Sequence, residues 1–170
     1  MSSSIVIAPI GSVVSLRRRY AFSHVVSILG GRDDVEFPGF GVSKVLQLKF
    51  DDVGYSSEYG RAASAADISS LIEFSSSWMS QGNLLVHCKA GTSRSPAAGM
   101  IILAALMEQD REVLIRKLLS MKAYYRPNTT MLRIADQLLS TGGLLVSIAH
   151  SLPVTDAQSS LGPARLVLDK

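Results

Sequence analysis

Residues 84–96 read LLVHCKAGTSRSP, and this stretch decides more about the chain than any other. It opens with an apolar run typical of a buried strand, passes through a short polar segment around Gly91, and continues into an apolar run of helical length. Cys88, the one cysteine in the chain, ends the strand-like part, and Arg94 follows it after five residues. A loop that turns from strand into helix aims successive backbone N–H groups at one point. We expect this loop to wrap an oxyanion and to present a sulfur nucleophile to it.

Each residue type in this loop suits that chemistry. Gly91 permits the backbone dihedrals of a tight turn, and Ser95 followed by Pro96 favours a helix start. Arg94 can bind two phosphate oxygens through its planar fork, and the positive surroundings favour thiolate over thiol at Cys88. The alternative is a buried structural cysteine beside a surface arginine. That alternative leaves the spacing of the four other residues unexplained.

Working outward, strand-like and helix-like segments alternate along the chain, which predicts an α/β fold with a mainly parallel central sheet and helices on both faces. The predicted strands are 5–8, 25–29, 45–50 and 84–86. The predicted helices are 13–20, 64–79, 96–106, 111–121, one from about 128, and 144–150. Ligands of such sheets bind beyond the carboxyl ends of the strands, where the Cys88 loop falls. We expect residues 1–152 to form a single catalytic domain, followed by a loosely attached C-terminal tail, 153–170.

Composition narrows the class of protein. The chain has 170 residues, 47% hydrophobic and 18% charged, as expected for one packed domain. Its net charge of +3 is too small and too scattered to indicate nucleic acid, and residues 17–19, the one basic run, fit a solvated helix face. A lone cysteine favours a reducing cytoplasm, and neither a signal peptide nor a membrane-inserted segment is expected. The histidines, His24, His87 and His150, are scattered, so no metal or other cofactor is expected.

Residues 87–95 resemble the signature of the cysteine-dependent protein tyrosine and dual-specificity phosphatases, in which His-Cys is followed by five residues and then by Arg-Ser or Arg-Thr. The chain looks most like the small bacterial members, in which a Phe-x-Asp strand end precedes the loop and an Arg-Pro-Asn helix start follows it. Residues 50–52 and 126–128 stand at those places, and the resemblance spans roughly 45–139. It implies a phosphotyrosine phosphatase-like fold and hydrolysis of phosphorylated protein through a phosphocysteine intermediate.

The same resemblance implies roles within the loop. Cys88 is the nucleophile, Arg94 binds the phosphate, and Ser95 helps the sulfur to leave in the second step. His87 hydrogen-bonds the loop, although a histidine at the end of an apolar strand is equally expected to be a satisfied core residue. A phosphate, sulfate or vanadate ion is expected in the loop. The expected substrate-binding residues are His87, Lys89, Ala90, Gly91, Thr92, Ser93 and Arg94.

A proton donor for the leaving group is expected after an upstream strand. Asp52, 36 residues before Cys88, is the preferred general acid and base because it lies farther beyond the strand end than Asp51. Asp51 stays open as the alternative, Glu58 is a weaker candidate, and glycines nearby could let this loop move. Asn128 is predicted to cap a helix, and the family pattern suggests that it also braces the phosphate loop.

Two other functions remain open at this point. One is a phosphoinositide phosphatase, since Lys89-Ala90-Gly91 resembles such loops, but a single loop lysine ranks it lower. The other is a non-catalytic module that binds phosphopeptides, which could dispense with Cys88 or with the acid. Preference for phosphotyrosine, phosphoserine or phosphothreonine depends on pocket depth. Residues 31–41 could form a pocket wall or a surface turn, and their turn-like composition favours the turn.

Overall fold

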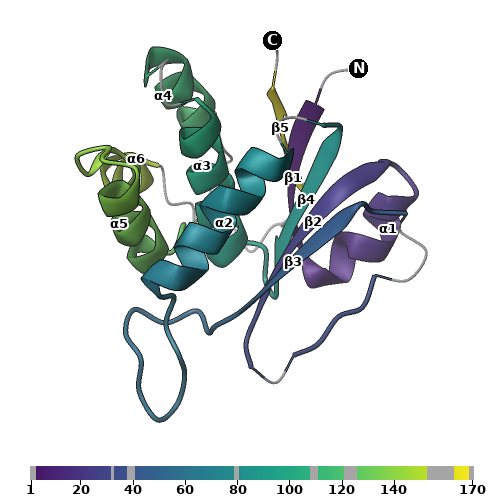
Figure 1. Cartoon of the computed structure of the whole chain (residues 1–170), viewed down its shortest axis with the longest axis horizontal. Coiled ribbons are helices and arrows are strands. Elements are labelled where there is room, and N and C mark those ends of the chain that lie inside the picture. Colours follow the sequence, from purple (N-terminus) through teal and green to yellow (C-terminus); the bar gives the residue numbers. More distant parts are fainter. Residues whose placement is uncertain are drawn as a thin grey trace.

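The computed structural model describes residues 3–31, 33–37, 41–78, 81–107, 111–120, 126–152 and 163–168. Within these ranges five strands form one sheet with helices on both faces (Figure 1). The strands are β1 (Ser3–Pro9), β2 (Phe22–Leu29), β3 (Lys44–Lys49), β4 (Asn83–Cys88) and β5 (Ala164–Leu168). The helices are η1 (Ile10–Ser12), α1 (Val13–Arg17), α2 (Ala65–Trp78), α3 (Arg94–Leu106), α4 (Arg111–Leu119), α5 (Thr129–Leu138) and α6 (Leu144–Ser151).

The sheet is parallel apart from one edge strand. Its order is β3-β2-β4-β1-β5, with β2 parallel to both β3 and β4, and β4 parallel to β1. The strands β1, β2 and β4 are buried along nearly their whole length, which explains their unbroken apolar runs. The register places the carboxyl ends of β3 and β4 at the same end of the sheet, since Leu29 pairs with Lys49 and Ile28 with Cys88. The predicted α/β fold is confirmed.

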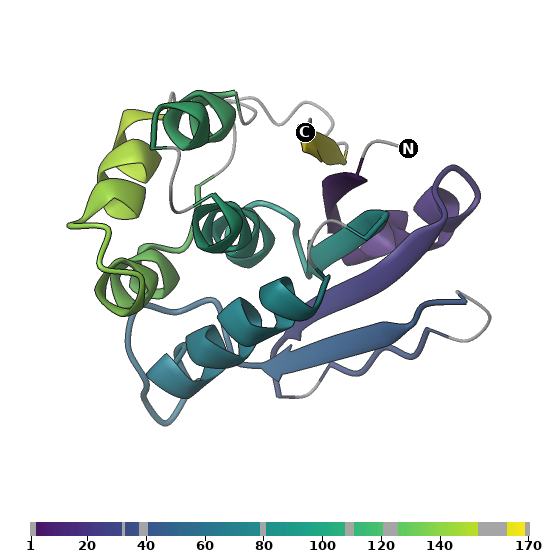
Figure 2. The same cartoon turned by 45° about the horizontal axis from the view of Figure 1, so that its top comes forward.

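The two faces of the sheet carry separate hydrophobic clusters. Along β1, Ile5 and Ile7 join the cluster beneath α2 and α3, whereas Val6 and Ala8 face the cluster around α1, as the alternation of a strand requires. Figure 2 shows α3 between the sheet and the outer helices. A Cβ at Gly99 would lie 2.7 Å from Ile7 Cδ1, so this glycine lets α3 approach the sheet closely. The buried α3 therefore anchors the loop that precedes it.

Two helix starts follow the predicted capping pattern. At α2, the backbone N–H of Ser64 donates to Asp67 Oδ2 at 2.8 Å, and the N–H of Asp67 donates to Ser64 Oγ at 3.3 Å. At α5, Asn128 Oδ1 accepts from the N–H of Met131 at 3.0 Å. The predicted helix ends at 79 and 121 lie outside the described residues.

One expectation about the last residues is wrong. Ala164–Leu168 is not part of a loose tail but forms β5, antiparallel to β1. Its Ala164 and Leu166 are buried against the sheet, and its backbone pairs with an edge of β1 that would otherwise be open. Residues 153–162 lie outside the described residues, and the domain limit at 152 stays a prediction.

Candidate active site

The Cys88 loop runs from the end of β4 to the start of α3, over the end of β1. Gly91 adopts φ +74°, in the left-handed region, and a Cβ there would lie 2.5 Å from the backbone nitrogen of Pro9. The N–H of Ile10 donates to the carbonyl of Lys89 at 3.3 Å. The loop is thus seated on β1, and only glycine fits at its middle.

The start of α3 differs from the prediction by two residues. The helix begins at Arg94, with Ser93 at the cap position, and not at Pro96. Pro96 lies in the first turn, where a missing N–H removes no helical hydrogen bond. Ser95 is inside the helix and is not its cap.

The sulfur of Cys88 lies at the base of this loop. The residue is 1% exposed, and its Sγ accepts a hydrogen bond from the N–H of Gly91 at 3.2 Å. The hydroxyl of Ser95 is also 3.2 Å from Sγ. Donors at these positions stabilise negative charge on the sulfur, as does the N-terminus of the helix behind it.

Arg94 is a buried cation at the same end of the sheet. It is 6% exposed, and its Nη1 donates to the carbonyl oxygen of Phe50 at 2.7 Å. Its Nε has no hydrogen-bond partner among the residues that the structure describes. A buried guanidinium with an unused donor is costly unless an anion completes its contacts. Arg94 and the N–H groups of the loop are therefore suited to hold a tetrahedral anion.

The two candidate acids point in different directions. The Oδ1 of Asp52 accepts from Ser93 Oγ at 2.6 Å and from Asn128 Nδ2 at 2.8 Å. The carboxylate of Asp51 instead accepts from the backbone N–H of Arg61 at 2.9 Å. The structure therefore brings Asp52, and not Asp51, into hydrogen-bonding contact with the Cys88 loop.

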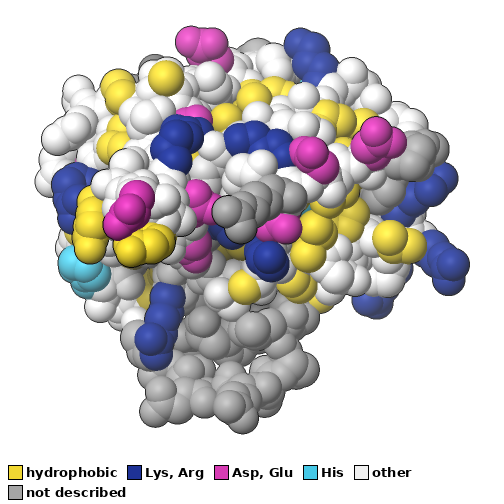
Figure 3. All heavy atoms as spheres, turned by 90° about the horizontal axis from the view of Figure 1, so that it is seen from below, with side chains coloured by type: hydrophobic (Ala, Val, Ile, Leu, Met, Phe, Trp, Pro, Cys, Tyr) yellow, Lys and Arg dark blue, Asp and Glu magenta, His cyan; other side chains and the backbone are white. Residues whose placement is uncertain are grey.

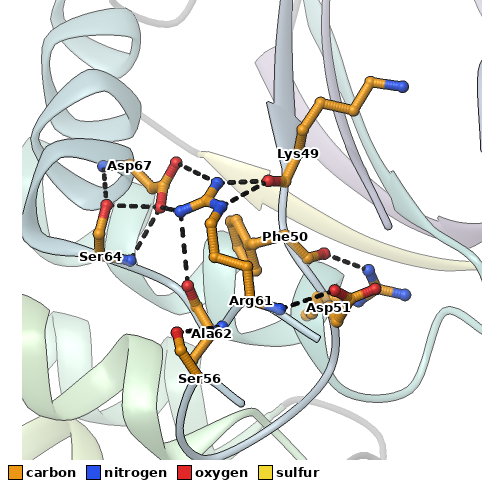
Figure 4. A network of polar contacts seen from close by, with 9 residues as sticks. Lys49, Phe50, Asp51, Ser56, Arg61, Ala62, Ser64 and Asp67 are labelled. Carbon is orange, nitrogen blue, oxygen red and sulfur yellow. Dashed lines mark hydrogen bonds and ion pairs between the residues drawn. The ribbon is translucent and has the colours of Figure 1, made fainter. Parts of the chain in front are cut away.

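A network around Arg61 holds the base of the segment that carries Asp52 (Figure 4). The guanidinium donates to Asp67 Oδ2 at 2.7 Å and to the carbonyl of Lys49, and it lies 5.8 Å from the centre of the Phe50 ring. The N–H of Asp51 donates to the carbonyl of Arg61 at 2.7 Å, so both ends of the loop are joined. The hydrogen bond to Asp67 raises the pKa of Arg61. Burial alone raises the pKa of Asp67, but hydrogen bonds from Arg61 and Ser64 outweigh it and hold that pKa below its ordinary value.

The start of α5 braces the outer side of the Cys88 loop. The N–H of Arg126 donates to the carbonyl of Thr92 at 2.8 Å, and the N–H of Asn128 donates to the carbonyl of Ser93 at 3.2 Å. The bracing that the family pattern suggested for Asn128 is thus confirmed at its backbone. Sequence reasoning missed the side chains of Ser93 and Asn128 as partners of Asp52, and only the Arg126–Asn128 motif hinted at the second.

His87 is fully buried at the end of β4. Burial lowers its pKa to about 4, against a smaller opposite effect of the Cys88 backbone. Neither ring nitrogen makes a hydrogen bond of ordinary geometry with the described residues, so its contact with the Cys88 backbone is weak. The ring instead meets the edge of Phe37, with centroids 5.5 Å apart. A neutral imidazole of this kind supports the end of the strand by packing.

A cavity of about 660 Å³ adjoins the Cys88 loop at Lys89. The ammonium group of Lys89 lies 3.3 Å from Asp33 Oδ2, and Tyr59, 91% exposed, stands at the margin. The cavity is lined by Gly30, Gly31, Asp33, Asp51, Glu58, Tyr59 and Lys89. Gly31 and Asp33 therefore belong to a pocket wall, and they also form part of the predicted turn, since the N–H of Asp33 donates to the carbonyl of Gly30 at 3.1 Å. Seen from this side, acidic and basic side chains are interspersed (Figure 3).

Two kinds of feature are absent from the described ranges. No group of three or more histidine, cysteine, aspartate or glutamate side chains there could hold a metal ion. No helix there is long and apolar enough to cross a membrane.

Comparisons with known proteins rest on structure alone. No protein-family model matches the chain, and no curated protein sequence matches it either. The human tyrosine phosphatase-like serine/threonine/tyrosine-interacting protein is 16% identical, with a TM-score of 0.60 over 81% of this chain and 92% of that chain. The Yvh1 phosphatase domain from Chaetomium thermophilum is 18% identical, with a TM-score of 0.58 over 81% and 91%. PTPMT1, solved in complex with PI(5)P, is 15% identical, with a TM-score of 0.56 over 84% and 90%. The chain has the fold of the tyrosine and dual-specificity phosphatases.

Proposed function

We propose that this chain hydrolyses phosphomonoesters through a phosphocysteine intermediate. In the first step the thiolate of Cys88 attacks phosphorus, the bond from phosphorus to the ester oxygen breaks, and Asp52 gives its proton to that oxygen. In the second step water attacks phosphorus, Asp52 takes a proton from the water, and the sulfur leaves as thiolate while Ser95 donates to it. Arg94 and the N–H groups of the loop stabilise the charge on the equatorial oxygens throughout.

The observation that carries the proposal is the arrangement around one sulfur. The Sγ of Cys88 accepts from the N–H of Gly91 inside a loop at a helix N-terminus, and the Nε of the buried Arg94 has no hydrogen-bond partner in the described part of the chain. Asp52 adds a carboxyl at the same edge of the sheet, hydrogen-bonded to that loop. A nucleophile, an anion cradle and a proton donor together support phosphoryl transfer to the sulfur.

Turnover of an aryl phosphate by the purified protein, with a chelator present, tests the proposal. Cys88→Ser and Arg94→Ala should each remove essentially all activity, and Asp52→Asn should lower turnover mainly of esters with poor leaving groups. Ser77→Ala is a matched control, because this exposed hydroxyl donates within its own helix, to the carbonyl of Phe74. Full activity of Cys88→Ser would contradict the proposal. Phosphopeptide binding without turnover by the unmutated protein would favour the non-catalytic module instead.

We further propose a phosphorylated protein, and not a phosphoinositide, as the substrate class. Lys89 is the loop cation available for a second phosphate, and it already pairs with Asp33. Two further carboxylates, those of Asp51 and Glu58, line the adjoining cavity and repel a polyanionic headgroup. Comparing kcat/KM for phosphopeptides and phosphoinositides distinguishes the two classes.

A further inference from the structure

Asp52 receives two hydrogen bonds at a single oxygen from two separate parts of the chain. Ser93 Oγ donates from the Cys88 loop at 2.6 Å, and Asn128 Nδ2 donates from the start of α5 at 2.8 Å. We propose that Ser93 and Asn128 are positioning residues: they hold Oδ1 of Asp52 as an acceptor, so that Oδ2 is the atom that carries the proton to the leaving group. This inference rests on the proposed function.

The orientation of the Asn128 amide is determined by its other contact. Its Oδ1 accepts from the N–H of Met131 at 3.0 Å, as the cap of α5. The amide nitrogen must therefore face Asp52, because turning the amide over would place an N–H against the N–H of Met131. Asn128 can only donate to Asp52.

Two donors on one carboxyl oxygen determine where a proton is held. An oxygen that accepts two hydrogen bonds behaves as the carbonyl oxygen of the acid, so a bound proton is placed on the other oxygen. Both donors persist when Asp52 loses the proton, and they then stabilise the carboxylate that must act as base in the second step. The same two contacts thus serve both directions of proton transfer.

Two further hydrogen bonds from the start of α5 support this arrangement. The N–H of Asn128 donates to the carbonyl of Ser93 at 3.2 Å, and Thr130 Oγ1 donates to the carbonyl of Gly54 at 2.9 Å. The start of α5 therefore holds the Cys88 loop on one side and the Asp52 segment on the other. One helix start thus contacts both the loop that carries Cys88 and the segment that carries Asp52.

Kinetics with aryl phosphates of graded leaving-group ability test the proposal. Ser93→Ala removes the hydroxyl but keeps the backbone N–H of the loop. Asn128→Ser keeps a good helix cap but removes the amide donor. For each variant we expect a loss of about two- to three-fold with 4-nitrophenyl phosphate, which needs little protonation, and about ten-fold or more with phenyl phosphate. Ser93→Thr keeps the hydroxyl and should restore the wild-type dependence of the rate on the leaving group. Ser77→Ala should keep that wild-type dependence.

The double variants separate positioning from general damage. In an Asp52→Asn background, Ser93→Ala and Asn128→Ser should cause no further steepening of the leaving-group dependence, because their effect acts through that carboxyl. Equal losses for all esters, or an undiminished effect in the Asp52→Asn background, would overturn the inference. Either result leaves the proposed function standing as long as Cys88→Ser is inactive, so the two failures are distinguishable.

Discussion

Replacing Gly91 with alanine tests whether the shape of the Cys88 loop is what the function needs. The new Cβ would lie too close to three atoms at the end of β1: Pro9 N at 2.5 Å, Pro9 Cδ at 2.8 Å and Ala8 C at 2.9 Å. Two of these are backbone atoms of a strand within the sheet, so the loop has to move. The φ of +74° adds a second penalty, because an L side chain disfavours the left-handed region.

The two penalties can be measured apart with two control glycines. Gly142 has φ +66° and nothing within 4 Å of its Cβ position, so Gly142→Ala pays only the backbone penalty of about 1–2 kcal/mol. Gly11 also has open space and no left-handed φ, so Gly11→Ala should be close to neutral. Overpacking adds about 1–3 kcal/mol, so Gly91→Ala should lower the free energy of unfolding by about 2–5 kcal/mol.

Urea unfolding and aryl phosphate turnover on the same preparations give the result. Because the loop must shift against β1, we expect Gly91→Ala to lose about 100-fold or more in kcat/KM, while both controls keep wild-type turnover. A Gly91→Ala protein that is no less stable than Gly142→Ala, with turnover within a few-fold of wild type, would refute the reasoning.

Three further predictions concern residues around the loop. The pKa of His87 is about 4 in the folded chain against 6.5 in the unfolded chain, so the unfolded state binds the proton first as the pH falls. The stability present above pH 6.5 is therefore lost towards pH 4, by about 2–3 kcal/mol at pH 4.5. Urea unfolding of His87→Leu should lack this pH-dependent loss of stability. Asp33→Asn frees Lys89 and should raise kcat/KM for bisphosphorylated over monophosphorylated substrates by a few-fold, as fits an exposed pair; an unchanged ratio argues against a part for this pair in specificity. Arg61→Lys cannot reproduce the forked contacts to Asp67 and should cost about 1 kcal/mol in urea unfolding, so wild-type stability of this variant would show that the network is dispensable.

Most elements follow from local pattern because their causes lie within a few residues. The strand predicted over 45–50 is observed as Lys44–Lys49, and the Ser64–Asp67 pair marks the start of α2. The start of α3 is displaced because a backbone turn around Gly91, and not the Ser95-Pro96 pair, sets where helical geometry begins. Local propensity thus locates elements better than their ends.

β5 shows where local pattern is insufficient. Five residues, ARLVL, bury only Ala164 and Leu166, which is too short a pattern to recognise as a strand. Its partner is β1 at the other end of the chain, and that partner is available only because the strand order leaves an edge of β1 uncovered. Pairing of this kind depends on the order of the strands in the sheet, and a short stretch of sequence does not specify that order.

By itself, the sequence determined the tight turn of the Cys88 loop, because the spacing from Cys88 to Arg94 and the glycine between them act through consecutive backbone units. It narrowed the candidate proton donors to Asp52, with Asp51 as the alternative and Glu58 as a weaker candidate. Tertiary structure alone decided that Asp52 reaches the loop, since its partners Ser93 and Asn128 lie 41 and 76 residues away along the chain. It also decided that Asp33 pairs with Lys89 of the loop and that Phe37 packs against His87. Such contacts are absent from local pattern because they exist only once the sheet has brought the ends of β3 and β4 together.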